Sequence, residues 1–374
     1  LQAAYAHLDE QMKSTIEHLS VVHSHDYILS LSSELSRRKE QGEYTHLPPV
    51  THPLVRVHPE TGKRSLFLSP HTMVGIEQMR NLSGREAAGH LGAAAWVGKE
   101  FEDADFVWPC AFSDLADEYQ HRHGLEYDHL MRIAQINFEN ARANPNAQSR
   151  DWQFTAESFS ADDEANPVVE GRTRKMDCGQ ITDGAATVFL ASEKRAADYA
   201  AKRGIALEDL PRIAGWGHRC APLSYKAKVT ASAKDPYVFP QVRGAIEDAR
   251  RRAGIEGADQ LDAVETHDCF AMTEYMAIDH LGITAPGESW KAIENGSIEK
   301  TGRIPVNPSG GLIGLGHPVG ATGVRMIHDA SQQVSGKAES CQVDGAGRVQ
   351  TLNIGGSTTT TVSFIVDSQA RTKF

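Results

Sequence analysis

The chain has 374 residues, 40% hydrophobic and 23% charged, which is long enough for two or three domains with packed cores. Its net charge of −11 excludes the basic surface that nucleic-acid-binding proteins carry. Because no run of 18 apolar residues occurs, a transmembrane helix is not expected.

The cysteines indicate a reducing compartment. They are odd in number, scattered and without a CxxC pair: Cys110, Cys178, Cys220, Cys269 and Cys341. This pattern fits neither a structural zinc site nor a secreted disulfide framework. The opening residues, 1–19, have neither the basic region nor the apolar core of a signal peptide. We therefore expect a cytoplasmic protein without a metal site.

The first 71 residues differ in kind from the rest, since they hold 8 of the 17 histidines and no glycine before Gly42. They predict a helical opening, a loop at 43–53 and a β-like passage at 54–70.

The middle of the chain predicts mainly helices. Their ranges are 83–101, 112–124, 127–145 and 193–204, with a loop at 145–175. The stretch "GAATVFLAS", residues 184–192, is short, apolar and partly β-branched, which predicts a buried strand.

From residue 205 onward strands and helices alternate, which indicates a layered α/β sheet. We expect helices at 239–254, 271–282 and 320–334, and strands at 261–266, 349–356 and 358–367. The "RRR" run at 250–252 predicts a solvated helix face paired with Glu247 and Asp248.

Three stretches carry chemistry. In the first, an apolar strand runs into His267-Asp268-Cys269 and directly into a helix. Catalytic side chains of α/β proteins gather at such carboxyl ends of strands, and a helix N-terminus with a nearby imidazole favours a thiolate. The alternative is a buried structural cysteine beside an incidental histidine.

The second stretch is "NPSGGLIGLGHPVGATG", residues 307–323, with His317 among glycines. Glycines let backbone N–H groups approach a ligand closely, and the helix expected after "GATG" offers unpaired donors to an anion. The imidazole could act as a base toward a thiol or as a donor to an oxyanion. The third stretch, "NIGGS" at 353–357, is either a hairpin turn or a source of bare N–H groups.

Together "HDCF", "GGLIGLGHPVGATG" and "NIGGS", in this order, resemble the C-terminal half of the thiolase superfamily, nearest the sterol-carrier-protein-x type. The resemblance covers 82–374 and implies a layered α/β fold. Its expected parts are a helical loop domain at 82–175, a remnant of the N-terminal domain at 176–208, and the C-terminal domain at 209–374.

The resemblance implies an acyl-CoA acyltransferase that carries out 3-ketoacyl-CoA thiolysis or Claisen condensation, with coenzyme A as substrate and no separate cofactor. His317 would activate the nucleophilic cysteine and help hold the thioester oxygen. Cys269 would move the proton at the α-carbon, and His267 would serve one oxyanion hole. The expected oxyanion or CoA contacts are Gly355, Gly316, Asn307 and Gly320.

The chain departs from the thiolase pattern at the nucleophile. None of its five cysteines stands in the Cys-Ala-Ser/Thr-Gly-like motif that carries this residue in the family. We therefore expect impaired activity, with a non-catalytic CoA-binding or scaffold protein as the alternative. Thiolases associate through N-terminal-domain sheets, much of which is missing here, so a homodimer has little support.

Residues 1–80 resemble a different family, the Fe(II)/2-oxoglutarate dioxygenases of the taurine and 2,4-dichlorophenoxyacetate type. The match is carried by "LPPVTHPLVRVHPETGKRSLFLSPHTMVGIEQM", residues 47–79, and implies a fragment of a double-stranded β-helix. "HSHD", His23–Asp26, is not the His-x-Asp iron motif. Dioxygenase activity is the third alternative.

Overall fold

The computed structural model describes residue 8 and residues 10–24, 48–57, 61–66, 73–76, 84–96 and 98–370. The chain divides into two compact units, Leu1–Ala87 and Ala88–Phe374. Each is described by itself below, as the first and the second unit.

The first unit is built from short antiparallel strands. Its described elements are α2 (Glu10–Ile16), β1 (Ser20–His23), β2 (Val50–Pro53), β3 (Val55–Val57), β4 (Arg64–Leu66) and β5 (Met73–Ile76). β1 lies between β2 and β5, and β3 pairs with β4 as a hairpin. The hairpin confirms the β-like passage expected at 54–70. Part of the loop expected at 43–53, and His25 and Asp26 of the "HSHD" stretch, lie outside the described residues.

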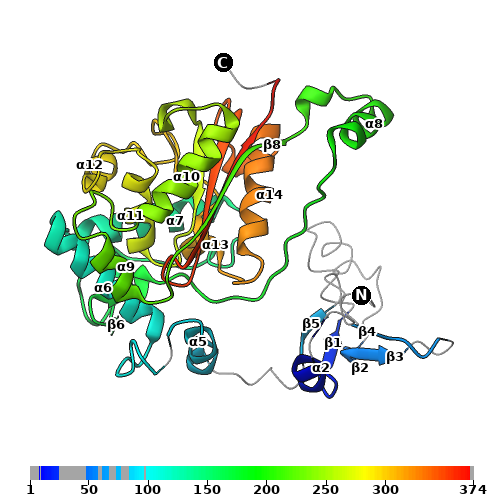
Figure 1. Cartoon of the computed structure of the whole chain (residues 1–374), viewed down its shortest axis with the longest axis horizontal. Coiled ribbons are helices and arrows are strands. Elements are labelled where there is room, and N and C mark those ends of the chain that lie inside the picture. The colour runs from blue at the N-terminus through cyan, green and yellow to red at the C-terminus, as the bar shows by residue number, and fades with distance from the viewer. Residues whose placement is uncertain are drawn as a thin grey trace. The chain divides into compact units, whose positions relative to one another are not determined.

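The second unit is organised around a mixed four-stranded sheet in the order β8-β11-β10-β9 (Figure 1). Its strands are β8 (Arg212–Cys220), β9 (Ala263–Thr266), β10 (Arg348–Gly355) and β11 (Thr360–Asp367). β10 runs parallel to β9 and antiparallel to β11, which in turn runs antiparallel to β8. A separate small hairpin joins β6 (Val168–Glu170) to β7 (Thr173–Arg174).

The remaining regular structure among the described residues is helical. They are α5 (Gly84–Gly92), which contains the boundary between the units, α6 (Val107–Arg122), α7 (Tyr127–Ala143), α8 (Glu193–Arg203), α9 (Tyr225–Ala231), α10 (Pro240–Ala253), α11 (Ala271–His280), α12 (Ser289–Glu294), α13 (Gly311–Leu315) and α14 (Thr322–Ser335). Single 3-10 turns lie at Glu157–Phe159, Lys175–Asp177, Leu207–Asp209, Ala258–Gln260 and Glu339–Cys341.

Helices cover both faces of the sheet. Successive side chains of a strand point to opposite faces, so neighbouring residues of β10 contact different helices. Val349 of β10 packs with Ala330 and Val334 of α14. The next residue, Gln350, accepts a hydrogen bond from Arg250 Nε of α10 at 2.9 Å. Figure 1 shows α10 and α14 on either side of the strands, which gives three layers.

The approach of α10 to β8 requires glycine in the strand. A Cβ added to Gly217 would lie 1.8 Å from the backbone oxygen of Ala245 in α10. No side chain fits in that space, so Gly217 lets the helix lie directly on the edge strand.

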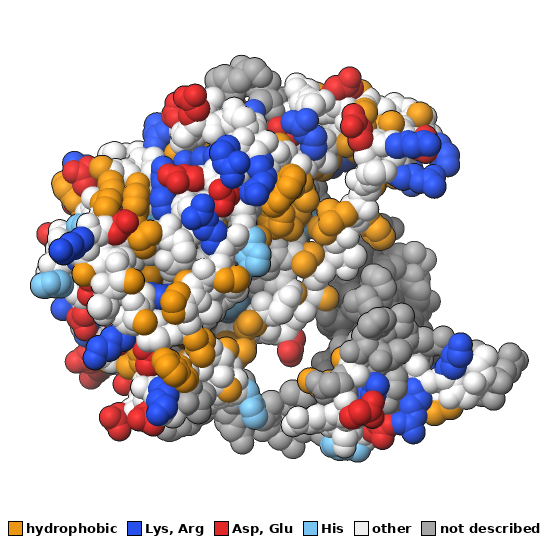
Figure 2. Space-filling model, in the orientation of Figure 1, with side chains coloured by type: hydrophobic (Ala, Val, Ile, Leu, Met, Phe, Trp, Pro, Cys, Tyr) orange, Lys and Arg blue, Asp and Glu red, His pale blue; other side chains and the backbone are white. Residues whose placement is uncertain are grey.

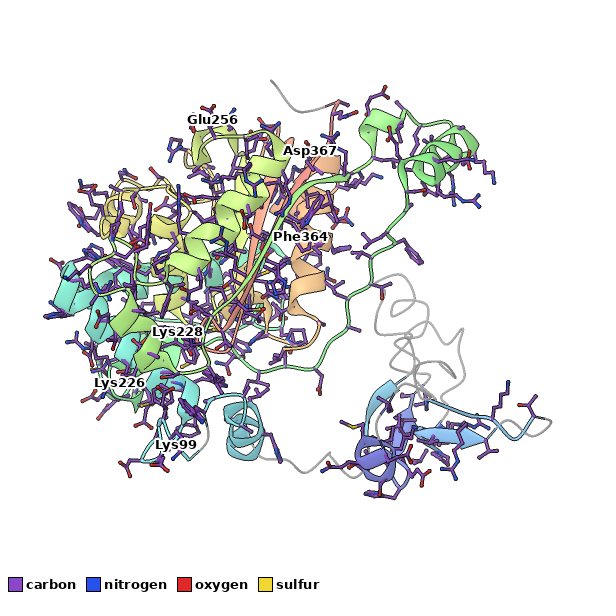
Figure 3. All side chains as sticks on the ribbon, in the orientation of Figure 1. Lys99, Lys226, Lys228, Glu256, Phe364 and Asp367 are labelled. Atoms are coloured by element: carbon purple, nitrogen blue, oxygen red, sulfur yellow. The ribbon has the colours of Figure 1, made fainter. Side chains whose placement is uncertain are left out.

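Most expected elements are confirmed, including the hairpin at the C-terminal end and all three helices expected after residue 205. The helix expected at 83–101 is shorter, since α5 ends at Gly92 and Gly98 has a left-handed φ of 73°. β8 and α13 were not expected. The C-terminal strand β11 carries Phe364 and Asp367 (Figure 3), and Arg212 donates to Asp367 at 2.9 Å, which ties β8 to it.

The buried strand expected at 184–192 is wrong. These residues form no strand, and Phe189 and Leu190 are 97% and 76% exposed. Figure 2 shows hydrophobic side chains on the surface along the extended segment that leads to α8. The pattern of the segment suits a strand, but no described strand pairs with it, and its apolar side chains are exposed among the described residues.

The solvated "RRR" face is wrong at its first residue. Arg250 is 3% exposed and bonded to Gln350 within the sheet, and burial lowers the pKa of its guanidinium to about 10. Arg251 does pair with Asp248 at 2.9 Å, whereas Arg252 stacks over the ring of Trp216. None of the helices in the described part of the chain is long and apolar enough to cross a membrane.

Candidate functional site

The His-Asp-Cys turn lies where a fully buried strand meets a fully buried helix. β9 ends at Thr266 and α11 begins at Ala271, so residues 267–270 form the connection. Every residue of both elements is buried, which fixes the turn at the carboxyl end of the strand.

His267 is held by a residue of the neighbouring strand. Its Nδ1 lies 2.7 Å from Asn353 Oδ1 on β10. Since an amide oxygen only accepts, this bond assigns the ring proton to Nδ1 and leaves the lone pair on Nε2. Burial lowers the pKa of His267 to about 4, so the ring is neutral at pH 7.

His317 is oriented by a hydroxyl on the helix that follows it. Its Nδ1 lies 2.8 Å from Thr322 Oγ1, the first residue of α14, and this hydroxyl can donate its own proton to Pro318 O at 3.3 Å. The hydroxyl then accepts from Nδ1–H, which leaves Nε2 of His317 as a proton acceptor. Burial, together with His267 and Arg325, lowers its pKa to about 3.

The fold brings these two histidines together. Their ring centroids are 5.2 Å apart and their planes cross at 88°. Both rings are buried and neutral, each with one nitrogen fixed by a side chain. The oxyanion role expected for His267 requires a proton on Nε2, which the bond to Asn353 does not favour, so that role stays a prediction.

Cys269 lies two residues from His267 and is half-buried. Its Sγ lies 3.6 Å from Thr273 Oγ1 in the first turn of α11. Burial raises the pKa of the thiol to about 12, which leaves it protonated. The thiolate that a helix N-terminus was expected to favour is therefore not formed, because burial outweighs the helix effect.

The other four cysteines give the two histidines no evident thiolate. Cys178 is paired along the backbone with Phe270, but its Sγ donates to Arg174 O at 3.3 Å and burial raises its pKa. Burial also raises the pKa of Cys110 and of Cys341 to about 11. Cys220 is exposed at the end of β8, where its Sγ lies 3.6 Å from His218 Nε2.

A short extended segment, residues 179–182, lies against both the His-Asp-Cys turn and the backbone at His317. Gly179 N donates to Cys269 O at 2.8 Å, and His317 N donates to Gln180 O at 2.9 Å. Gly316 has a φ of 122°, and a Cβ on it would lie 3.1 Å from Thr182 Oγ1. Glycine is thus required at 316 for the backbone to pass this segment.

The two remaining glycines of the expected site lie in turns. Gly320 has no atom within 4 Å of the place a Cβ would take, and it precedes α14. Gly355 ends β10 opposite Thr360. Ligand contacts for both remain predictions.

Lys228 of α9, labelled in Figure 3, forms hydrogen bonds with the turn after Gly355. Its buried Nζ donates to Ser357 Oγ at 2.8 Å and to Thr359 Oγ1 at 3.2 Å. Burial lowers the pKa of this amine to about 8. Thr358 between them has a left-handed φ of 64°, so Lys228 stabilises a turn that its own residues do not favour.

Asn307 lies within the fold rather than at its surface. It is fully buried and has a φ of 50°. Its Oδ1 accepts from Thr266 N at 2.8 Å, and its Nδ2 donates to Glu274 Oε2 at 2.7 Å. These bonds position the end of β9, and a contact with CoA stays a prediction.

A buried carboxylate network that the sequence reasoning missed lies behind the turn. Asn137 of α7 donates to both Asp268 Oδ2 (2.9 Å) and Glu274 Oε2 (2.7 Å). Asp268 Oδ1 in turn accepts from Leu312 N at 2.6 Å. Through these bonds α7, the His-Asp-Cys turn and the segment leading to His317 hold one another in place.

A third acid, Glu265, lies beside this network. Ser309 Oγ donates to Glu265 Oε2 at 2.6 Å, and Arg325 Nη1 lies 4.0 Å from the same oxygen. Burial raises the pKa of Asp268 to about 6 and that of Glu265 and of Glu274 to about 8. One signal was present in the sequence, since Asn137, Asn140 and the C-cap residue Asn144 interrupt the apolar face of an amphipathic helix.

The described residues of the first unit form no comparable site. Rings of His23 and His52 lie 5.7 Å apart on paired strands. No group of three potential metal ligands occurs among the residues that the structure describes.

Comparison of the sequence with known proteins assigns the chain to a family. The chain is 32% identical over 287 residues to an acetyl-CoA acetyltransferase of Methanothermobacter thermautotrophicus, covering 76% of this chain and 68% of that protein. The chain belongs to the thiolase family. The sequence model of the thiolase C-terminal domain-like family matches residues 224–368.

Two further proteins are similar to this chain. Human sterol carrier protein 2 is 28% identical over 258 residues, which cover 68% of this chain and 45% of that protein. The solved Ltp2-ChsH2(DUF35) aldolase has a TM-score of 0.56 at 18% identity, covering 69% of this chain and 63% of that one, and so shares the fold. This thiolase-family chain thus spans about two thirds of the acetyltransferase and less than half of sterol carrier protein 2.

The N-terminal part matches another family. The sequence model of the taurine catabolism dioxygenase TauD, TfdA family covers residues 1–128. The dioxygenase resemblance is thus confirmed, although the match continues past residue 80 into residues that pack within the second unit.

Proposed function

We propose that the chain is a thiolase-type acyl-CoA acyltransferase in which His317 and Cys269 carry the proton transfers. The observation that supports this most is the perpendicular pair His267–His317, two neutral imidazoles whose Nε2 atoms are free to take a proton. Family membership supports the substrate class, because a named relative is an acetyl-CoA acetyltransferase.

In this proposal an imidazole Nε2 removes a proton from the α-carbon of the thioester. The C–H bond breaks, its electron pair moves into an enolate, and the negative charge collects on the thioester oxygen. A negative charge beside an imidazolium raises the pKa of that ring. The low pKa values of His267 and His317 therefore do not prevent the transfer. The protonated thiol of Cys269 can donate its own proton to the enolate carbon, and the thiolate that this leaves then regains a proton from the imidazolium, which restores both groups.

The oxyanion and the CoA thioester would be held by backbone donors. Gly320 and Gly355 are proposed for this role, with Asn307 positioning the turn beside them. Gly316 N already donates to Leu312 O at 3.2 Å, so Gly316 is proposed only for the close approach of its backbone to the ligand. Coenzyme A enters as substrate, and the proposal requires no further cofactor.

None of the described cysteines is assigned here as the thiol that carries the acyl group. Burial holds Cys269 protonated, and Cys178 is bonded to a backbone oxygen. We therefore expect proton transfer to survive in this chain better than acyl transfer does.

Two measurements on the purified chain separate these steps. Exchange of the α-protons of acetyl-CoA in D₂O reports proton transfer, and loss of the acetoacetyl-CoA enolate absorbance with free CoA reports thiolysis. Exchange that is lost in His317→Ala and in Cys269→Ala supports the proposal. Exchange retained in Cys269→Ala would remove that residue from it.

A second candidate is cleavage of a carbon–carbon bond without an acyl-enzyme. Retro-aldol cleavage of a β-hydroxyacyl thioester needs a base that removes the hydroxyl proton. The bond between the α- and β-carbons then breaks, an aldehyde or ketone leaves, and the thioester enolate takes up a proton, so no nucleophile is required. The site offers neutral bases and no thiolate, and the solved relative of the same fold is named an aldolase. Acetyl-CoA released from a β-hydroxyacyl-CoA in the absence of free CoA would favour this function.

A non-catalytic CoA-binding protein is the remaining alternative for the second unit. Saturable CoA binding without exchange, thiolysis or cleavage would establish it, and no CoA binding would exclude all three. For the first unit, the dioxygenase match supports one assay. Fe(II)-dependent succinate formation from 2-oxoglutarate would show a working iron site.

A further inference from the structure

Helix α7 presents two chemically different faces. Asn137 and Asn140 within the helix and Asn144 just past its end point toward the His-Asp-Cys turn and the segment at 307–309, where they bond to Asp268, Asn307 and Ser309. Residues 135, 138, 139 and 142 lie about half a helical turn away, at 100° per residue. This second face therefore looks away from His267 and His317.

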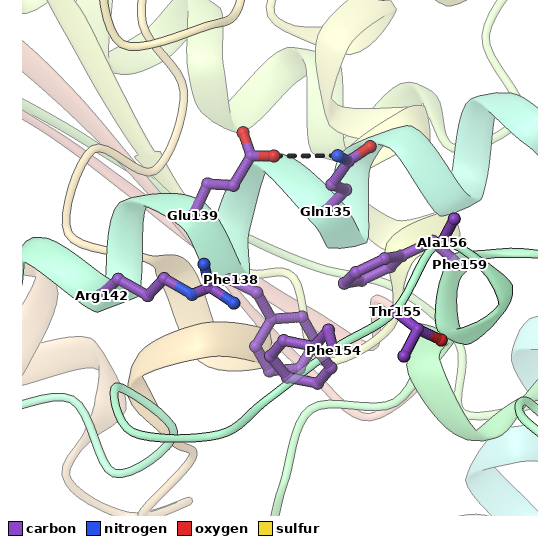
Figure 4. A pocket seen from close by; sticks show the side chains of 8 residues that line it. All are labelled: Gln135, Phe138, Glu139, Arg142, Phe154, Thr155, Ala156 and Phe159. Carbon is purple, nitrogen blue, oxygen red and sulfur yellow. Dashed lines mark hydrogen bonds between the residues drawn. The ribbon is translucent and has the colours of Figure 1, made fainter.

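A cavity of about 430 Å³ opens on that second face (Figure 4). It is lined by Gln135, Phe138, Glu139, Arg142, Phe154, Thr155, Ala156 and Phe159. Its volume is within the range of small-molecule pockets. None of the residues assigned to the catalytic site lines it, so it is a separate site.

The floor of the cavity is aromatic and fixed. The ring centroid of Phe138 lies 4.5 Å from that of Phe154 and 6.0 Å from that of Phe159. Phe138 is almost fully buried, and the two other rings pack on it from the loop at 154–159. Such a cluster offers flat apolar surface to a ligand without having to rearrange.

Two charged side chains, Glu139 and Arg142, line the cavity, and only Arg142 has no described side-chain partner. Glu139 accepts a hydrogen bond from Gln135 Nε2 at 2.8 Å, which Figure 4 shows. The side chain of Arg142 is exposed and makes no hydrogen bond or ion pair with any residue in the described ranges. Figure 4 shows its side chain extending along the helix toward Phe138.

We propose that this cavity binds a small organic carboxylate with an apolar body. The carboxylate would take the guanidinium of Arg142, a geometry that allows two parallel hydrogen bonds, and the body would pack on Phe138, Phe154 and Phe159. Glu139 disfavours a second negative charge, so a monocarboxylate fits better than a dicarboxylate. The proposal concerns a site separate from the thioester chemistry and does not depend on it.

Calorimetric titration of the full chain tests this with three probes. Phenylacetate and hexanoate carry the same charge on a ring and on a chain, and phenylacetamide is the neutral analogue of the first. We expect saturable binding of a carboxylate at millimolar concentration and binding of the amide at least about tenfold weaker, the cost of one charge-assisted contact. The ratio of phenylacetate to hexanoate affinity tells an aromatic from an aliphatic ligand.

Variants assign the contact to Arg142. Arg142→Gln should weaken carboxylate binding about tenfold, and Arg142→Lys should weaken it less because it keeps the charge. Arg150→Gln, an exposed arginine outside the cavity lining, is the matched control and should bind as the unmodified chain does. Absence of saturable binding, equal binding of acid and amide, or unchanged binding in Arg142→Gln would each overturn the proposal.

Discussion

The rings of His267 and His317 meet at 88° with their centroids 5.2 Å apart, although one follows a strand and the other a glycine-rich turn. Each ring has Nδ1 engaged by a side chain, Asn353 in one case and Thr322 in the other. The pair is therefore oriented before any ligand binds, which is what a proton-transferring site requires.

Thr322 sets the tautomer of His317, and its removal should slow proton transfer. We expect Thr322→Val, which keeps the shape and loses the hydroxyl, to reduce α-proton exchange of acetyl-CoA about tenfold or more with little change in CoA affinity. Imidazole ¹⁵N shifts should show a loss of the Nδ1–H form, which a purely structural change would not produce. Ser331→Ala on the same helix is the control. Unchanged exchange and shifts would refute the orienting role.

Buried acids make stability fall at higher pH. Glu274 has its pKa raised from the ordinary value to about 8, so between pH 4.5 and 8 the unfolded chain releases a proton that the folded chain keeps. His267 and His317 act oppositely, but only below pH 6.5, where the unfolded state binds their protons. The free energy of unfolding should therefore decrease from pH 6.5 to 8.

Glu274→Gln tests this assignment, because it removes the ionisation and keeps the acceptor for Asn137 and Asn307. We expect the slope between pH 6.5 and 8, measured by urea unfolding, to become shallower by up to about 1 kcal/mol per pH unit. Glu139→Gln, an exposed change on α7, should leave the slope as it is. An unchanged slope in Glu274→Gln would place the titration elsewhere.

Asn137 holds two buried carboxyl groups with one amide. Asn137→Ala should lower the free energy of unfolding by about 3 kcal/mol, since two acceptors lose their donor in a place that water does not reach. Asn137→Asp, nearly identical in shape, should be worse at pH 8 than at pH 5 because it adds a charge beside Asp268. Gln135→Ala on the outer face should cost less than about 0.5 kcal/mol. Equal effects of Asn137→Ala and Gln135→Ala in chemical denaturation would contradict the network.

Thiol reactivity should separate Cys220 from Cys269. Cys220 is exposed, whereas the pKa of Cys269 is about 12, which leaves a thiolate fraction on the order of 10⁻⁴ at pH 8. Labelling with a disulfide reagent, followed by peptide mass spectrometry, should find Cys220 modified first and Cys269 far more slowly. A Cys220→Ser variant should lose the fast phase. Fast labelling of Cys269 would make it a nucleophile and revise its role as a proton donor.

The exposed segment at 184–192 should be an early site of proteolysis. Phe189 and Leu190 are accessible and form no strand, so brief chymotrypsin treatment should cut there before it cuts at the buried Phe138. Phe189→Ser should slow the cut and change the free energy of unfolding by less than about 0.5 kcal/mol. Protection of this segment in the intact chain would mean that another surface covers it.

The sequence alone determined where the candidate site motifs stand in the chain and most of the elements around them. "HDCF", the glycine-rich turn with His317, and the alternation of strands and helices after residue 205 are local patterns, and local patterns follow from side-chain period and turn residues.

Only the tertiary structure decided which side chains meet. Arg250 is buried because α10 lies on the sheet with that face inward, and "GAATVFLAS" is exposed because no described strand pairs with it. The perpendicular histidines and the carboxylates behind them depend on the register of β9 against β10 and on the backbone path around Gly316. Burial, and with it the pKa of each of these groups, is a property of neighbours that are distant in the chain, which periodicity and spacing do not report.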